Sequence, residues 1–251
     1  MNEKRLNKFL SEQGLCSRRE ADTWIEAGRV SVNGQIASLG TKITAADRVR
    51  VDGRDVKMKA RKHSYYALNK PRGIVCTCDP KEKNNIVDYL GVDHRVFPIG
   101  RLDKDSEGLI LLTDDGDIVN RILRARYKHE KEYLVETRED FDDDFLSRMA
   151  SGVRILGTKT EPCRVERISS RRFKIVLTQG LNRQIRRMCE ALGHEVVFLR
   201  RIRIMNISLG KLGLGEYRPL GYKELQQVLE LIERAEARER AKPSSRKGAR
   251  D

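Results

Sequence analysis

The feature that most constrains the fold of this chain is a short apolar run, Leu109–Leu112, set between turn-forming residues. Glycines and carboxylates flank it in the stretch FPIGRLDKDSEGLILLTDDGD, residues 97–117. A short apolar run between turn signals is typical of a buried strand. Asp103 lies in the loop just before this strand, close to Arg101 and Lys104. Because loop aspartates are most often turn formers or caps, a chemical role for Asp103 needs support from the rest of the chain.

The pattern around this run predicts mixed α and β structure over residues 65–233. Alternating apolar and polar residues indicate strands in YYALN, EYLVET, CRVERI and RFKIVLT. Helical spacing indicates helices at residues 117–125, 141–152 and 183–193. No internal repeat of roughly 20–50 residues is visible, so the pattern argues against a repeat array.

The pattern of helix and strand signals in residues 1–57 predicts a separate small domain. Apolar residues at helical spacing in RLNKFLSEQG indicate a first helix. Ser17 and Glu20 have the capping-box spacing for a second helix, which ends at Gly28. RVSVNGQIA then predicts two strands joined by an Asn-Gly turn, and DRVRVDG predicts another strand.

Two segments are expected to lie outside the folded domains. Residues 58–64 are polar and predict a linker between the two domains. Residues 234–251 contain almost no apolar side chain except Ala, so they predict a frayed helix end followed by a disordered basic tail.

The charge of the chain indicates a polyanionic partner. Lys and Arg number 51 against 37 Asp and Glu, which gives a net charge of +14. Nucleic acid is the commonest such partner. An anionic membrane surface is the alternative, but no basic amphipathic helix with an aromatic face is visible.

The start of the sequence and its cysteines favour a cytoplasmic protein. The segment MNEKRLNKFL lacks the apolar region of a secretory signal, and no run is long enough for a membrane span. Five cysteines, an odd number, fit a reducing cytosol better than a disulfide framework. Cys76 and Cys78 lack the spacing of a zinc site, so no metal is expected. We therefore predict a soluble cytoplasmic monomer with no membrane partner.

The N-terminal unit resembles the αL (S-four-type) RNA-binding domain. The stretch RLNKFLSEQGLCSRREADTWIEAGRVSVNG carries the resemblance. The resemblance implies that basic side chains of this unit line an RNA-facing side, namely Lys8, Arg18, Arg19 and Arg29. The alternative is a solvated basic face on a small structural domain.

Four motifs follow one another along the rest of the chain: LNKPRG, GRLDKDSEGLILLTDDGD, KEYLV and GLNRQIRRM. In this order they resemble the pseudouridine synthases of the RsuA/RluB/RluF branch, and among them the RluF-type enzymes of large-subunit ribosomal RNA. The resemblance implies an α+β catalytic domain whose mixed, mostly antiparallel central sheet is flanked by helices. The active-site cleft would cross that sheet with Asp103 on its floor.

The implied reaction needs little beyond one carboxylate. Isomerising uridine means breaking N1–C1′, turning the base and forming C5–C1′, which requires no external electrons. The sequence shows no phosphate-cradling glycine loop and no metal cluster, so no cofactor is expected. An ionised carboxylate suffices as nucleophile, or as electrostatic and general-base partner at the sugar. The resemblance assigns this role to Asp103 in the RLD motif.

Two further residues complete the expected catalytic set. Burial raises the pKa of a carboxyl group and a nearby cation lowers it, and the resemblance places Arg186 in a salt bridge with Asp103. Without the resemblance, Arg186 would be interpreted as a surface phosphate contact. Tyr133 shares a strand face with Val135 and is expected to lie against the flipped base, which needs a surface to replace lost stacking. Two alternatives stay open for Tyr133: it takes part in proton transfer, or it is a half-buried aromatic residue with only a structural role in the strand.

Several arginines are expected to hold the RNA backbone around a splayed loop. They are Arg72, Arg101, Arg183, Arg187, Arg200, Arg201 and Arg203.

The predicted function is site-specific conversion of uridine to pseudouridine in ribosomal RNA, and transfer RNA stays open as an additional substrate. One alternative is a non-catalytic RNA-binding or ribosome-assembly factor, in which Asp103, Tyr133 or Arg186 would be substituted. Another is a different RNA-modifying enzyme, such as a methyltransferase, which would need a glycine-rich cofactor loop after a first strand, and no such loop is visible in the sequence.

Overall fold

The computed structural model describes residues 3–57, 62–124 and 127–241. The chain divides into two compact units, one formed mainly by residues 1–63 and the other by most of residues 64–251. Part of the predicted linker, residues 58–61, and the end of the predicted tail, residues 242–251, lie outside the described ranges.

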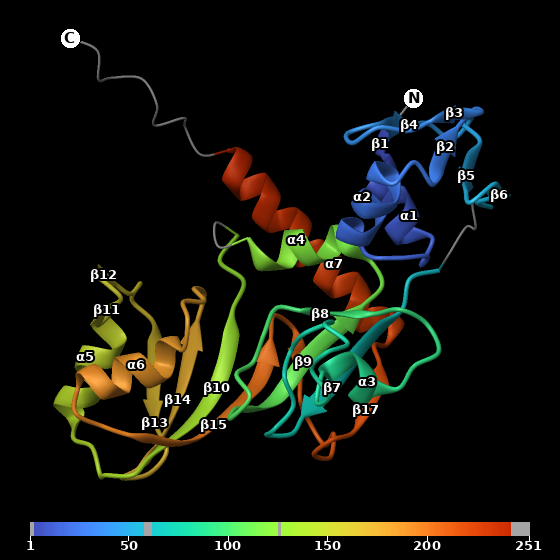
Figure 1. Cartoon of the computed structure of the whole chain (residues 1–251). Coiled ribbons are helices and arrows are strands. Elements are labelled where there is room, and N and C mark those ends of the chain that lie inside the picture. Colours follow the sequence, from blue (N-terminus) through green and yellow to red (C-terminus); the bar gives the residue numbers. More distant parts are fainter. Residues whose placement is uncertain (1–2, 58–61, 125–126, 242–251) are drawn as a thin grey trace. The chain divides into compact units, whose positions relative to one another are not determined.

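The N-terminal unit has the two helices and the small sheet that the sequence predicts (Figure 1). The capping box of Ser17 and Glu20 starts the second helix, and the Asn33–Gly34 turn has positive φ at both residues, as a tight hairpin requires. Strands β3, β2, β5 and β6 form an antiparallel sheet in that order, and β1 pairs with β4. The elements are β1 Lys4–Arg5, α1 Leu6–Glu12, α2 Arg18–Glu26, β2 Val30–Val32, β3 Gln35–Ile36, β4 Lys42–Ile43, β5 Val49–Val51 and β6 Arg54–Asp55.

The second unit is built on a nine-stranded sheet with the order β13-β14-β10-β15-β9-β7-β17, to which β8 and β16 add at β9 and β15 (Figure 1). Every pairing is antiparallel except the one between β15 and β9. The predicted mixed, mostly antiparallel sheet is therefore confirmed. Its strands are β7 Tyr65–Lys70, β8 Phe97–Ile99, β9 Glu107–Thr113, β10 Lys131–Thr137, β13 Arg164–Arg167, β14 Arg172–Leu177, β15 Val196–Ile204, β16 Ile207–Ser208 and β17 Tyr217–Pro219.

The apolar run Leu109–Leu112 lies within the buried strand β9. All seven of its residues are buried, and it lies between β7 and β15 inside the sheet. Gly108 permits the parallel pairing, because it lies opposite Arg201 in the register and has φ +105°. A Cβ atom at Gly108 would come within 2.7 Å of the Arg201 backbone nitrogen and closer still to its carbonyl oxygen.

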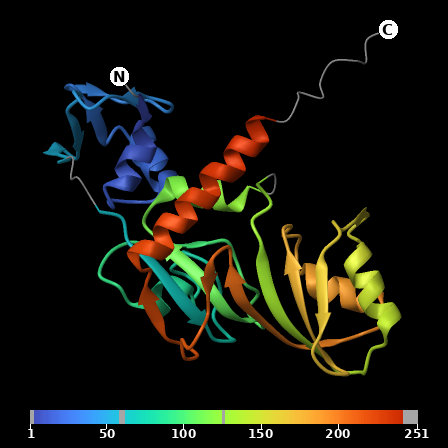
Figure 2. The same ribbon diagram turned by 180° about the vertical axis from the view of Figure 1, so that it is seen from behind.

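Helices cover both parts of the sheet. Helices α5 and α6 bury one cluster against β10, β14 and β15, which includes Phe145, Met188 and Phe173. Helices α4 and α7 bury a second cluster against β7 and β9, and Figure 2 shows α7 lying across α4. The helices are α3 Ile86–Leu90, α4 Gly116–Leu123, α5 Asp143–Ser151, α6 Gln184–Ala191 and α7 Tyr222–Arg240; a short hairpin, β11 Arg154–Ile155 with β12 Thr158–Lys159, follows α5.

Helix α7 extends further than the sequence suggests. The predicted catalytic domain ends at residue 233, whereas the helix continues to Arg240. Arg121 of α4 and Glu236 of α7 form an ion pair at 2.9 Å, which ties this last part of the helix to the domain. In the described part of the chain, no helix has the length and apolar character that crossing a membrane requires.

Candidate active site

The loop between β8 and β9, residues 100–106, presents Asp103. Backbone N–H groups supply several of the hydrogen bonds that hold this loop: Ser106 N–H donates to the Asp103 carbonyl at 3.1 Å, Gly73 N–H to the Lys104 carbonyl at 2.8 Å, and Leu102 N–H to Cys76 Sγ at 3.3 Å. The Asp103 backbone thus closes a turn, as the simplest interpretation of a loop aspartate expects. Its side chain is 34% exposed and lines a pocket, so it is also available for chemistry.

This pocket has a volume of about 450 Å³, within the range of ~300–1,000 Å³ typical of ligand sites. Asp103, Lys131, Tyr133 and Arg201 line it together with the turn that leads into α6. A wider hollow of about 760 Å³ also has Arg183 in its lining and has mainly charged walls. The smaller pocket is the candidate active site because it contains both Asp103 and Tyr133.

Tyr133 and Arg201 lie directly opposite each other on β10 and β15, next to a bulge. The Arg201 guanidinium carbon is 6.0 Å from the centre of the Tyr133 ring. Arg201 is 3% exposed; its Nε donates to the Leu109 carbonyl at 2.7 Å and its Nη1 to the Arg101 carbonyl at 3.3 Å. The sequence predicts Arg201 at the surface, in contact with the RNA backbone. That surface position is wrong, because Arg201 is buried inside the domain.

Arg183, immediately before α6, is the arginine that faces Asp103. Its Nη1 lies 3.6 Å from Asp103 Oδ2, and two of its nitrogens bond the Asp105 carboxylate at 3.2 Å each. The Arg183 backbone is in the left-handed region with φ +48°, which is uncommon for a non-glycine residue. Burial favours a higher pKa for Asp105, but the hydrogen bond from Arg183 and the charges of Arg186 and Arg183 outweigh it, so the pKa lies below its usual value.

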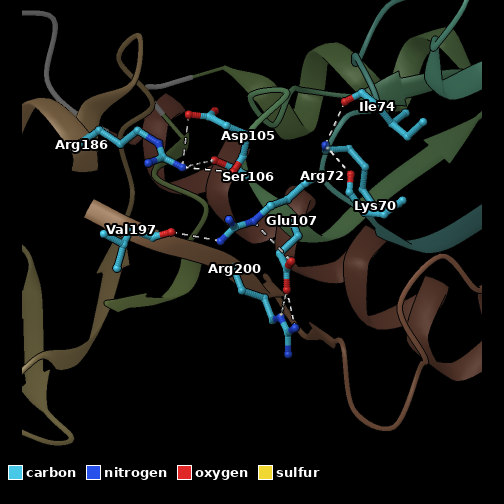
Figure 3. Close-up of polar contacts among 10 residues, drawn as sticks. Lys70, Arg72, Ile74, Asp105, Ser106, Glu107, Arg186, Val197 and Arg200 are labelled. Carbon is cyan, nitrogen blue, oxygen red and sulfur yellow. Dashed lines mark hydrogen bonds and ion pairs between the residues drawn. The ribbon is translucent and has the colours of Figure 1, made fainter. Parts of the chain in front are cut away.

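Arg186 does not form the predicted salt bridge with Asp103, and that prediction is wrong. Its Nη1 donates to the Val196 carbonyl at 2.9 Å. Its Nη2 donates to the Asp105 carbonyl at 3.2 Å and to Ser106 Oγ at 3.3 Å (Figure 3). The reason is position on the helix: Arg186 lies inside the first turn of α6 and reaches the base of the loop and the start of β15. Arg183, ahead of that turn, reaches Asp103. Burial lowers the pKa of Arg186, although the Asp105 charge opposes this.

Two other predicted RNA contacts form a network around buried Glu107 (Figure 3). Arg200 Nε donates to Glu107 Oε1 at 2.6 Å, and Arg72 Nε lies 3.6 Å from Glu107 Oε2. Arg72 also donates to the Val197 carbonyl at 3.1 Å, and both guanidinium groups lie over the Phe198 ring. Arg72 keeps an exposed side chain, at 46%, and can still reach a ligand.

The remaining arginines predicted to contact RNA differ in their partners within the protein and in their exposure. Arg203 is paired with Glu132 at 2.7 Å and Glu130 at 3.0 Å, so its charge is already balanced inside the protein. Arg187 donates to Asn182, while Arg101 is exposed at the rim of the pocket.

In the N-terminal unit, Arg18 and Arg19 are exposed at the start of α2. Arg29 is paired with Asp52 at 2.6 Å and lies over the Trp24 ring, and Lys8 Nζ is 3.5 Å from Glu12. Their expected contact with RNA stays a prediction.

Sequence reasoning missed Lys131 and Lys70. Lys131 lines the pocket, and burial together with the Arg201 charge lowers its pKa to about 8. The signal was available, because Lys131 precedes Tyr133 by two residues and therefore shares its strand face. Lys70 is fully buried; its Nζ donates to the carbonyls of Pro71 and Ile74 at 2.9 Å each, and burial lowers its pKa (Figure 3).

Among the described residues, no group of three or more His, Cys, Asp or Glu side chains could hold a metal ion.

Comparison with known proteins agrees with this architecture. Residues 64–191 match the family model of RNA pseudouridylate synthase, and residues 4–49 match that of the S4 domain. The dual-specificity RNA pseudouridine synthase RluF of Salmonella typhi is 51% identical over 246 residues, which is 96% of this chain and 85% of the relative. The ribosomal large subunit pseudouridine synthase B of Bacillus subtilis is 34% identical over 238 residues, covering 91% of this chain and 97% of the relative.

Structural comparison gives the same answer. A crystal structure of a pseudouridylate synthase aligns with a TM-score of 0.65 at 31% identity, covering 89% of this chain and 99% of that one. These matches span both units and favour an enzyme over a non-catalytic RNA-binding factor. The chain belongs to the RNA pseudouridine synthase family, as an enzyme that carries an S4 domain ahead of its catalytic domain.

Proposed function

We propose that this enzyme converts a specific uridine of large-subunit ribosomal RNA to pseudouridine, acting as a monomer in the cytoplasm. The observation that carries the proposal is the pocket in which Asp103 and Tyr133 meet, beside the guanidinium of Arg183. The B. subtilis relative, named for the large ribosomal subunit, supports the choice of RNA.

Each residue of the pocket has a separate task in this proposal. The target uridine leaves its stack and enters the pocket, where the Tyr133 ring replaces part of the lost stacking. The Asp103 carboxylate acts at the sugar, as nucleophile or as general base, while N1–C1′ breaks. Arg183 holds a positive charge 3.6 Å from that carboxylate.

Arg186 is proposed as a positioning residue rather than a catalytic one. Its three hydrogen bonds join α6 to the base of the Asp103 loop and to the start of β15. A loop held in this way loses less freedom when the reacting geometry forms, which is how positioning contributes to rate.

The proposal extends to a second class of RNA. The S. typhi relative is named for dual specificity toward RNA, and transfer RNA is the class that we propose for this chain. The exposed Arg72 and Arg101 at the pocket and its neighbouring hollows are available for backbone contacts with either RNA.

The test maps pseudouridines in ribosomal and transfer RNA from cells that contain this protein, lack it, or carry the Asp103→Asn variant. We expect at least one site in large-subunit RNA to disappear both without the protein and with the variant. Loss of sites only in small-subunit RNA would overturn the choice of substrate. Sites that persist with Asp103→Asn would overturn the role of Asp103.

A further inference from the structure

Two cationic side chains of the pocket have no carboxylate partner. In the part of the chain that the structure describes, neither Lys131 nor Arg201 forms an ion pair, and the Arg201 Nη2 atom is buried without any hydrogen-bond partner. Burying an unpaired polar or charged group is costly. Such a group therefore indicates a ligand that completes its interactions.

Two nearby acids, Glu132 on β10 and Glu130 just before it, cannot supply this partner. Side chains alternate across a strand, so Glu132 and Glu130 lie on the face opposite Lys131 and Tyr133. Both are already engaged with Arg203, at 2.7 Å and 3.0 Å. The two cations thus share one face of the sheet with the Tyr133 ring, and nothing on that face of β10 neutralises them.

The missing ligand has to enter the pocket, because Arg201 is only 3% exposed. A backbone phosphate stays with the RNA chain at the surface, whereas a flipped base is inserted. The guanidinium of Arg201 lies beside the Tyr133 ring, where a base would stack. The ligand is therefore a planar, negatively charged ring that contacts Tyr133.

We propose that Lys131 and Arg201 bind the uracil ring as an anion during turnover. This rests on the proposed function, the isomerisation of uridine. When N1–C1′ breaks, its electron pair stays on the base, and the negative charge spreads over N1, O2 and O4. Lys131 and Arg201 stabilise that anion with preorganised donors. The ring then turns and uses an electron pair to form C5–C1′. C5 loses its proton and N1 gains one, so the product is an isomer.

The depressed pKa of Lys131 makes this contribution dependent on pH. Its pKa is about 8, so the amine carries its charge below that pH and loses it above. Burial lowers the pKa of His129 below its usual value, so this side chain is neutral where Lys131 titrates. The other charged groups that line the pocket are Arg101, Asp103, Arg124, Arg183 and Arg201.

The test compares uridine with 5-fluorouridine at the target position, in single-turnover reactions at saturating RNA and neutral pH. Fluorine at C5 withdraws electrons, so the departing ring needs less help as an anion. We expect Lys131→Met to slow uridine conversion by about 100-fold, as loss of one oxyanion-stabilising donor does. Consumption of 5-fluorouridine should slow by a clearly smaller factor. Lys131→Arg should recover most of the rate, and its rate should not fall as pH rises through 8.

Lys174→Met is the matched control, because Lys174 lies on the neighbouring strand β14 and is paired with Glu166 outside the pocket. It should leave both rates unchanged. Thermal unfolding and RNA affinity check that the variants are folded, and Lys131→Gln serves if Lys131→Met is not. Equal slowing of both substrates, or no slowing, would overturn this inference while leaving the proposed function intact. A wild-type enzyme that converts no uridine in either RNA would instead overturn the proposed function.

Discussion

The aspartates Asp103 and Asp105 belong to one loop but have different surroundings. Asp105 accepts two hydrogen bonds from Arg183, and its carboxylate lies 3.5 Å from Arg186. Asp103 meets Arg183 only at 3.6 Å and lines the pocket beside Tyr133. The structure therefore separates a carboxylate engaged in holding the site together from one that faces the substrate space.

At the residue scale, we expect Asp103→Asn to abolish tritium release from C5-labelled uridine in RNA while RNA affinity changes little. Asparagine has nearly the same shape but no charge, so the loss would be chemical. Asp143→Asn is a suitable control, since Asp143 is an exposed acid at the start of α5. Activity of Asp103→Asn within tenfold of wild type, roughly 1.4 kcal/mol of barrier, would contradict the assignment.

The pairing geometry predicts different defects for Arg183 and Arg187, two arginines four residues apart. Arg183→Met removes the cation nearest Asp103 and should lower the maximal single-turnover rate at saturating RNA. Arg187→Met is the comparison, because the Arg187 side chain donates to Asn182 and, among the described residues, to no carboxylate. It should raise the RNA concentration for half-maximal rate instead. A normal maximal rate in Arg183→Met would show that this cation has no part in the reaction.

Arg186 links elements, and its loss should appear in stability. Arg186→Met leaves the acceptors at Val196, Asp105 and Ser106 without their donor. An unsatisfied buried group costs about 1–3 kcal/mol, so the free energy of unfolding should fall by that order. Denaturant titration measures the change, and Arg187→Met should show almost none. Full stability of Arg186→Met would mean that the loop does not depend on this anchor.

Local periodicity was enough to predict many elements but not how they pair. The helices at 117–125, 141–152 and 183–193 and the strands β7, β9, β10, β13 and β14 lie where the sequence pattern placed them, whereas it did not indicate β15. The parallel contact of β15 with β9 joins segments that are far apart in the sequence, so no local pattern could indicate it. Contacts between distant segments also decide which arginine lies next to Asp103. The motifs indicated Asp103 itself, but the resemblance named Arg186 as its partner instead of Arg183. Which arginine faces Asp103 depends on the left-handed backbone of Arg183, which nothing in its side chain requires.

At the element scale, Gly108→Ala should disrupt the junction of β9 and β15. The new Cβ would meet the Arg201 backbone, which cannot move without breaking the sheet. Gly157→Ala is the matched control, because Gly157 has φ +75° with open space around its Cβ position. The control should cost about 1–2 kcal/mol through its left-handed backbone alone. Gly108→Ala should cost more than about 3 kcal/mol or fail to fold, and similar costs for the two would argue against a clash.

Across the whole molecule, positive charge is unevenly divided between the units. Residues 1–57 contain 11 Lys and Arg against 8 Asp and Glu, so they carry only +3 of the net +14. Much of that basic charge is paired inside the unit, as in Arg29 with Asp52 and Arg48 with Asp55. Arg18 and Arg19 form no ion pair with any residue that the structure describes. The N-terminal unit should therefore contribute a few specific phosphate contacts rather than a general electrostatic attraction.

This division predicts the effect of removing residues 1–57. RNA affinity should fall and its salt dependence should flatten, because each lost phosphate contact reduces the slope of log affinity against log salt by about 0.7–0.9. The remaining domain should stay folded, since the buried cluster of the N-terminal unit consists only of residues between Leu6 and Val56. Circular dichroism and thermal unfolding of the shortened protein check this second point.

The full-length double variant Arg18→Gln/Arg19→Gln tests the same idea with the unit still present. If these two side chains each contact a phosphate, the slope should fall by roughly 1.4–1.8. The maximal rate at saturating RNA should stay normal, because neither residue belongs to the pocket. Binding titrations over a series of salt concentrations give both slopes in one experiment. A deletion that lowers affinity while the double variant keeps the wild-type slope would place the RNA contacts elsewhere in the unit. An unchanged slope in both proteins would show that the N-terminal unit makes no phosphate contacts.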